Sequence, residues 1–284
     1  MIDDVDSLLA LKGIALAVWL ALLFGLERWR PLAEPPTVAK GRPGLWRLAR
    51  NAGLWLANTG LSPLVVIPVS VWAASLTDWR PAAWSGGWSI LIDVIILDLW
   101  IYWWHRANHE IPVLWRFHEV HHLDRFLDTT TAVRFHFGEV LLSALVRVPV
   151  IIAFDVSWTA ILVFETLVLA SALFHHSNLA IPPRVERALA QVVVTPSIHW
   201  IHHHRIRRDT DSNYGAIFSF WDRMFGSRSA TKRSPAMPIG VEGREERGFV
   251  GLLARPFRGE PGSAAPAEHA HGGSKPLRRP DGSA

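Results

Sequence analysis

The sequence contains no cysteine. This absence excludes disulfide bonds, metal sites built on thiolates and catalysis by a cysteine nucleophile. A bound metal ion must therefore be held by nitrogen or oxygen atoms. The start of the chain also lacks the positive charge and the small-residue cleavage site of a secretory signal peptide, because Asp3, Asp4 and Asp6 precede the first apolar run. We therefore expect that run to be retained.

Charged residues make up only 19% of the 284 residues, whereas hydrophobic residues make up 50% and there are 15 tryptophans. Indole rings favour the boundary between lipid headgroups and hydrocarbon. The basic residues behind the net charge of +4 lie mostly beside apolar segments, which favours a membrane surface over nucleic acid as the partner. The composition therefore predicts an integral membrane protein that binds no nucleic acid.

Five apolar runs are candidates for entering a bilayer, which takes about 20 residues to cross: 8–26, 53–76, 88–104, 138–154 and 159–174. Pro63 and Pro68 are expected to kink the second run. The last two runs are short, so a hairpin that enters without crossing is an alternative. Arg147 and Glu165 lie near the middle of these two runs and are expected to pair.

The basic loop at 28–50 is placed in the cytoplasm by the positive-inside rule, which leaves the N-terminus outside. Following the runs from there brings every histidine group to the cytoplasmic side. The sequence thus predicts an all-α fold, a polytopic bundle of four to five apolar helices with a cytoplasmic helical cap. We expect it in a cell membrane of the bacterial inner-membrane type.

The 14 histidines are unevenly distributed. They form an H-x-x-x-H motif at 105–109 and two H-x-x-H-H motifs at 118–122 and 199–203, with His136, His175 and His176 between. Thr195 followed by Pro196 predicts the start of a helix carrying the last motif. Residues at i, i+3 and i+4 share one helix face, so each motif directs imidazoles to a common point. Nine or ten imidazoles exceed the four to six ligands of one ion, so two metal ions are predicted.

Asp98 precedes His105 by two helical turns inside an apolar run. Ionised groups are expensive there and usually functional. A carboxylate that orients a ligand imidazole explains the placement. An ion pair that only packs helices is the alternative.

At these residues the chain resembles the fatty acid hydroxylase/sterol desaturase superfamily of membrane di-iron oxygenases. The resemblance covers about 90–227 and lies in W-H-R-A-N-H, L-W-R-F-H-E-V-H-H, A-V-R-F-H-F-G-E, F-H-H-S-N, T-P-S-I-H-W-I-H-H, N-Y-G and W-D-R-M-F-G. It implies that two iron ions, which zinc can replace in a purified protein, use O2 to hydroxylate or desaturate a lipid. Electrons would come from a separate ferredoxin-, cytochrome- or reductase-type protein.

The resemblance implies ten metal ligands: His105, His109, His118, His121, His122, His136, His176, His199, His202 and His203. Beside them we expect Asp98, Glu139 and Asp211 to accept hydrogen bonds from ligand imidazoles, and Asn213 to shape the loop over the site with Tyr214 and Gly215. His175 and His204 exceed the pattern. Phe137 replaces the family's usual proline.

The chain is expected to divide into membrane helices and a basic linker (1–87), a fatty acid hydroxylase-like catalytic domain (88–227) and a polar extension (228–284) that is disordered from about 256. His269 and His271 in that tail are not expected to bind metal. Two other functions compete: a histidine-rich membrane metal transporter or metal store, and a zinc hydrolase without redox chemistry. A transporter would place ionisable residues along a path through the bilayer, with repeated halves.

Overall fold

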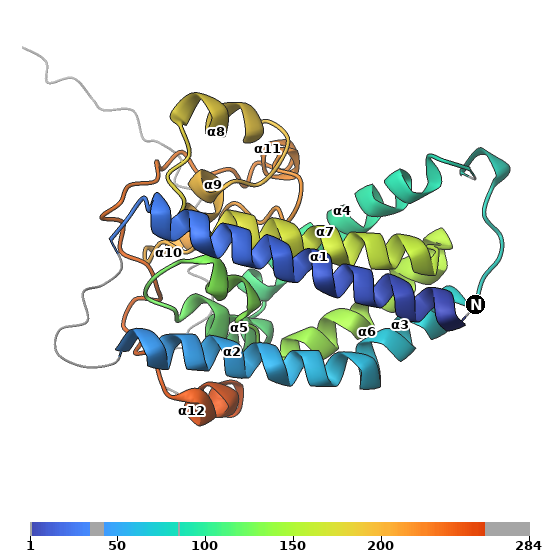
Figure 1. The fold of residues 1–284 in the computed structure, drawn as a ribbon, viewed down its shortest axis with the longest axis horizontal. Coiled ribbons are helices and arrows are strands. Elements are labelled where there is room, and N and C mark those ends of the chain that lie inside the picture. The colour runs from blue at the N-terminus through green and yellow to red at the C-terminus, as the bar shows by residue number, and fades with distance from the viewer. Residues whose placement is uncertain (1, 35–42, 85, 259–284) are drawn as a thin grey trace, which may run out of the picture.

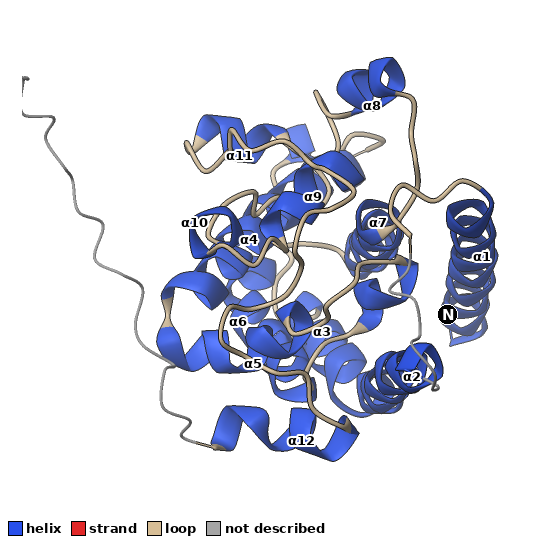
Figure 2. Ribbon diagram, turned by 90° about the vertical axis from the view of Figure 1, so that its left-hand side faces the viewer, coloured by secondary structure: helices blue, strands red, loops and turns tan. Residues whose placement is uncertain are grey.

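The computed structural model describes residues 2–34, 43–84 and 86–258. Over these ranges the chain is helical and contains three isolated β-bridges but no strand (Figure 2). The prediction of an all-α fold is confirmed. The α-helices are α1 Ile2–Trp29, α2 Pro43–Leu61, α3 Ile67–Ala74, α4 Ser89–Glu110, α5 Pro112–His122, α6 Phe137–Phe154, α7 Trp158–His176, α8 Pro183–Leu189, α9 Pro196–His202, α10 Arg207–Thr210, α11 Phe220–Met224 and α12 Phe249–Ala254.

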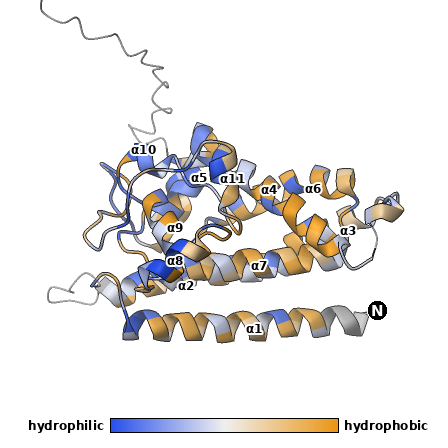
Figure 3. Ribbon diagram, turned by 90° about the horizontal axis from the view of Figure 1, so that it is seen from above, coloured by the Kyte–Doolittle hydropathy of each residue, from blue (hydrophilic) through white to orange (hydrophobic). Residues whose placement is uncertain are grey.

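Four helical segments of the described chain are long and apolar enough to cross a membrane: Ser7–Trp29, Gly44–Ala74, Phe137–Phe154 and Trp158–His176. They carry exposed apolar side chains. On α1, for example, Leu11, Ile14 and Val18 are each more than 60% exposed. Apolar residues dominate this part of the molecule, whereas polar residues gather on the short helices (Figure 3). Lipid is the environment that suits such a surface, as expected for an integral membrane protein.

The second of these segments is interrupted at Pro63. There α2 passes into a π-helix, Ser62–Val66, before α3 begins. Proline lacks the N–H group that would continue the α-helical hydrogen bonds, and a π turn is one response to that loss. The run is therefore not a regular α-helix throughout, and the irregularity lies at one of its two prolines.

The expected third run lies in α4, which is not among the four apolar segments. Asp93 and Asp98 are fully buried in this helix, and both have protein partners. Asp93 pairs with Arg80, and Asp98 accepts hydrogen bonds from the loop that leads into α11. Both aspartates are therefore paired within the protein, although Leu91 and Trp103 of the same helix remain exposed.

Helices α6 and α7 form the expected hairpin around Asp155, whose φ of 50° lies in the left-handed region. The Asp155 carboxylate accepts hydrogen bonds from Thr77 and from the backbone N–H groups of residues 79 and 80. Arg147 donates to Glu165 across the hairpin at 2.9 Å, so the predicted pair is confirmed.

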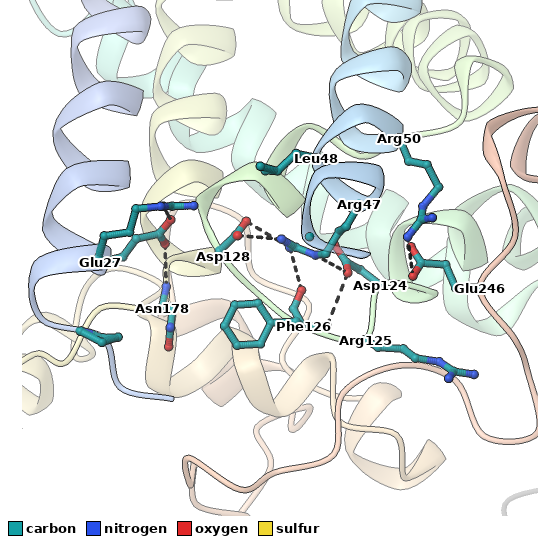
Figure 4. Close-up of a pocket in the computed structure, with 13 residues that line it drawn as sticks. Glu27, Arg47, Leu48, Arg50, Asp124, Arg125, Phe126, Asp128, Asn178 and Glu246 are labelled. Carbon is teal, nitrogen blue, oxygen red and sulfur yellow. Dashed lines mark hydrogen bonds and ion pairs between the residues drawn. The ribbon is translucent and has the colours of Figure 1, made fainter. Parts of the chain in front are cut away.

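The short helices α5, α8, α9, α10 and α11 gather at the end of the bundle away from the N-terminus (Figure 1). The N-terminal part of α2 is held on this cap by Arg47, whose guanidinium donates to Asp124 at 2.7 Å and to Asp128 at 2.7 Å (Figure 4). It also donates to Thr131 at 2.8 Å. Burial alone would raise the pKa of Asp124, but the charges of Arg47 and Arg134 lower it to about 2. This network holds the loop that follows α5.

The first part of the C-terminal extension packs on the cap. Leu252 on α12 is buried against Leu54, Val120 and Leu123, and Arg255 donates to Glu119 at 2.9 Å. Near 256, where disorder was expected to begin, Arg255–Phe257 form a 3-10 helix in which Pro256 is buried. The rest of that prediction, with His269 and His271, lies outside the described residues.

Candidate metal centre

Nine histidines converge in two adjoining groups. The first group consists of His105, His109, His118, His122 and His202, and the second of His121, His176, His199 and His203. Within each group, one ring nitrogen from every member lies within 4.8 Å of the others. The groups touch where the His122 and His203 rings stack with centroids 4.2 Å apart. Helices α4, α5, α7 and α9 supply eight of these residues, and His203 follows α9 directly as its C-cap.

Each H-x-x-H-H motif contributes to both groups. On α5, His118 and His122 join the first group and His121 the second, whereas at α9 His199 and His203 join the second and His202 the first. Successive residues of an α-helix are rotated by about 100°, so neighbouring histidines cannot face one ion. The expectation that each motif faces a single point is corrected here, because each motif bridges two points.

The spacing of the nitrogens suits metal coordination. Ring nitrogens of His105 and His118 lie 3.1 Å apart, and those of His176 and His199 lie 3.0 Å apart. Two nitrogens at roughly 2.1 Å from one ion and at right angles to each other are about 3.0 Å apart. Further ring nitrogens, including Nε2 of His109 and Nε2 of His202, are buried without a hydrogen-bond partner. An ion in the first group would satisfy the two named atoms, because His109 and His202 both belong to that group.

The imidazoles are held in the form that binds metals. Burial, reinforced by the neighbouring His118, lowers the pKa of His105 to about 3. Burial also lowers the pKa of His202 and His203 well below the usual value. Neutral imidazole is the ligand form, so protonation does not compete with metal near neutral pH.

Backbone carbonyls orient several rings. The Nδ1 atom of His105 donates to the carbonyl of Tyr214 at 2.9 Å, and that of His202 donates to the carbonyl of Ser212 at 2.7 Å. The Nδ1 atom of His121 donates to the carbonyl of Arg134 at 3.2 Å. These bonds leave Nε2 free to face the group centre. Sequence reasoning did not identify them, because a carbonyl acceptor carries no side-chain signature.

Two of the expected carboxylates lie beside ligand imidazoles. Glu139 accepts from Nδ1 of His118 at 2.8 Å. Asp211 accepts from Nδ1 of His109 at 3.3 Å and is held by Arg207, which also donates to the carbonyl of His109. Both carboxylates therefore orient members of the first group.

Replacing Glu139 by leucine is expected to lower metal affinity or turnover by 10–100-fold, the usual cost of losing such a partner. The change deprives Nδ1 of His118 of its acceptor. Glu139→Gln should cost less, because an amide oxygen still accepts. Metal titration of both variants measures the two losses of metal affinity. Equal losses would show that metal affinity does not depend on this hydrogen bond.

Asp98 and Asn213, which were also expected beside the ligand imidazoles, have other roles than Glu139 and Asp211. Asp98 contacts no histidine. Its carboxylate accepts from the backbone N–H of Ile217 at 3.0 Å, from that of Phe218 at 3.1 Å and from the indole of Trp221 at 2.8 Å. The expectation that it orients an imidazole is corrected, since Asp98 instead anchors the loop to α4. Asn213 does shape that loop, with a φ of 55° and bonds to Ile198 and Ser229.

Asp222 is a residue of the site's support that sequence reasoning missed. It accepts from the N–H of Tyr214 at 2.7 Å and from that of Gly215 at 3.0 Å, and so fixes the carbonyl that orients His105. Its place in the W-D-R-M-F-G motif was the available signal.

Gly215→Ala is expected to displace this loop. An added Cβ would lie 2.7 Å from the carbonyl oxygen of Phe218 and 2.9 Å from Oδ2 of Asp222. Overpacking of this kind costs roughly 1–3 kcal/mol, and it should weaken metal binding by the first group. Thermal unfolding and metal content measure both effects. Gly87→Ala is the control, because nothing lies within 4 Å of the added atom; similar losses in the two variants would contradict the expectation.

The other described histidines, His136, His175 and His204, lie outside the two groups. His136 differs from its expected role as a ligand, because its Nδ1 accepts from the N–H of Gly138 at 2.9 Å and its Nε2 donates to the carbonyl of Leu253 at 3.1 Å. It caps α6 instead. His175 is buried with its ring centroid 4.0 Å from that of His199, and His204 donates to Asp209 at 2.7 Å.

Comparison with known proteins agrees with this geometry. The profile of the family described as Fatty acid hydroxylase matches residues 90–227, the span that contains all nine histidines. Over this span the chain is similar to the fatty acid hydroxylase family. Nothing among the solved structures matches the chain.

Several curated relatives are also similar to the chain. Ornithine lipid hydroxylase OlsE of Rhizobium tropici is 28% identical over 197 residues, 69% of this chain and 58% of the relative. Alkylglycerol monooxygenase of Danio rerio is 30% identical over 51% of this chain and 31% of the relative. Human (Homo sapiens) lathosterol oxidase is 28% identical over 49% of this chain and 44% of the relative. The chain thus spans between about a third and three fifths of the length of these relatives.

A cavity of about 260 Å³ opens from the two histidine groups into the bundle. Its wall near the metal centre includes His118, His121 and His176, and its far wall includes Arg147 and Glu165. Between them the lining is largely apolar, with residues such as Trp104, Ala144 and Val168. An apolar chain in this cavity would point at the two histidine groups.

Proposed function

We propose that the protein is a membrane-bound di-iron oxygenase that hydroxylates or desaturates a C–H bond of a lipid, using O2 and electrons from a separate donor protein. The observation that carries the proposal is the pair of adjoining all-imidazole groups at the mouth of an apolar cavity. The relatives are named as a lipid hydroxylase, a monooxygenase and a sterol oxidase, and these names support lipid oxidation.

In this proposal the nine histidines of the two groups hold the ions, and His136 is left out. Two iron ions would supply the reduction of O2 and the oxidising power for an unactivated C–H bond. The chain's own residues position and insulate the reaction. Carbonyls of Tyr214, Ser212 and Arg134 hold the protons on Nδ1 of their histidines, and the apolar cavity wall excludes water from the lipid.

The division into membrane helices (1–87), catalytic domain (88–227) and extension (228–284) belongs to the same proposal. The basic linker after α1 supports a site on the cytoplasmic face of a bacterial inner membrane. A metal transporter fits less well, because the nine histidines gather at one end of the bundle and line no path along it.

The test is metal analysis of protein purified without oxygen, followed by oxygen uptake with a chemical reductant and mass analysis of membrane lipids. We expect two irons per chain, reductant-dependent oxygen uptake and a lipid product heavier by one oxygen atom or lighter by two hydrogen atoms. Zinc with hydrolysed lipid would favour the hydrolase, and metal uptake by vesicles without oxygen consumption would favour the transporter.

A further inference from the structure

Three charged side chains from separate helices meet inside the bundle. Lys12 on α1 pairs with Glu165 on α7 at 3.0 Å. Arg147 on α6 donates to the same carboxylate at 2.9 Å and to the Ser70 hydroxyl at 3.1 Å. The three residues, here called the triad, lie within segments apolar enough to cross a membrane.

The triad carries an excess of positive charge. One carboxylate is shared by two cations, and arginine stays protonated in proteins. The side chain of Arg147 is only 7% exposed, and its Nε is buried without a hydrogen-bond partner. Uncompensated charge at membrane depth is costly and usually marks a function. An anion from outside the protein would neutralise the triad and give Arg147 the acceptor it lacks.

The triad lies where two cavities meet. One is the cavity of the metal centre, which reaches Arg147 and Glu165. The other, of about 950 Å³, is lined by residues of α1, α2 and α7, including Leu16, Trp55 and Leu169, and reaches Lys12 and Glu165. Val66, Val140 and Glu165 line both. Among the described residues lining either cavity, the one other carboxylate is Glu139, which is engaged by His118.

The triad is far from the metal centre along the cavity. Glu165 precedes His176 by 11 residues on α7, which corresponds to about 16 Å along the helix axis. A substrate anchored at the triad would therefore present a carbon well along its chain to the histidines.

We propose that the triad binds the anionic group, a carboxylate or a phosphate, of a single-chain lipid whose apolar chain fills the cavity toward the histidines. The inference rests on the proposed function for the fate of that chain and names its substrate class. Lys12 and Arg147 bind the anion, Glu165 holds the two cations in place, and oxidation falls about 16 Å from the anion.

The experiment measures equilibrium binding of radiolabelled palmitate, hexadecyl phosphate and hexadecanol to the full chain in phosphatidylcholine nanodiscs. Lys12→Met removes the excess charge and leaves the Arg147–Glu165 pair intact. We expect it to weaken binding of the two anions about tenfold and to leave hexadecanol unchanged. Lys12→Arg should restore anion binding, and Glu165→Gln, which adds a net positive charge, should strengthen it if the chain folds.

The tighter of the two anions identifies a carboxylate or a phosphate site. The proposal is overturned if the unmodified protein binds hexadecanol as tightly as the tighter of the two anions, or if Lys12→Met weakens all three ligands equally, as a purely structural role of the triad would predict. Thermal unfolding of each variant separates the two roles. Binding requires neither iron nor turnover, so a failed oxygenase assay leaves this test intact.

Discussion

His203→Ala is expected to reduce the bound metal from two ions per chain to about one and to lower lipid oxidation by more than about 100-fold, beyond the usual cost of losing an outer partner of a ligand. His203 is one of only four imidazoles in the second group, and its removal leaves three. The first group keeps all five members. Elemental analysis of the purified variant measures the stoichiometry, and mass analysis of lipids measures turnover.

The matched control is His136→Ala, which removes a buried imidazole outside both groups. It should retain two ions, although losing the cap of α6 can lower stability by about 1 kcal/mol. Two ions and full turnover in His203→Ala would contradict the assignment, as would loss of an ion in a well-folded His136→Ala protein.

Arg47→Met is expected to destabilise the fold by about 3–5 kcal/mol, the usual cost of breaking a buried ion pair from one side. The guanidinium bonds two carboxylates, of which Asp124 is fully buried and Asp128 nearly so. Without it, both keep their burial and lose a cation, and the loop after α5 loses its attachment to α2 (Figure 4). Thermal unfolding followed by circular dichroism in detergent measures the loss.

Arg106→Met serves as the comparison, because Arg106 forms an exposed i,i+4 pair with Glu110. Such a pair contributes about 0.3–0.5 kcal/mol. Equal effects of the two changes would show that the Arg47 network adds nothing to stability. The double variant that combines Arg47→Met with Asp128→Asn should recover part of the lost stability, because it removes one uncompensated charge.

Helix runs and the histidines that converge were largely predictable because both have a local signature. Apolar length identified the spanning segments, and imidazoles at i, i+3 and i+4 identified residues that face a common region. Where a local pattern has two explanations, prediction failed. Asp98 has the spacing of a residue that orients His105, but its partners are Ile217, Phe218 and Trp221, about 120 residues away in the sequence.

His136 illustrates the same limit. The R-F-H motif resembles a ligand motif, yet the direction of the ring depends on the start of α6 and on the carbonyl of Leu253. Leu253 belongs to the extension, for which the sequence predicted no packing role. A single histidine carries no periodicity that fixes its orientation, whereas the motifs on α5 and α9 do.

The sequence by itself determined the class of the protein: an all-helical membrane bundle with a cluster of histidines that could hold a metal. These features follow from composition and short-range spacing, which act within a helix. Only the tertiary structure decided how the histidines divide, because α5 and α9 each place adjacent imidazoles about 100° apart toward different partners. It also decided that Lys12, Arg147 and Glu165 meet, since helix packing, unlike helix formation, depends on residues far apart in the chain.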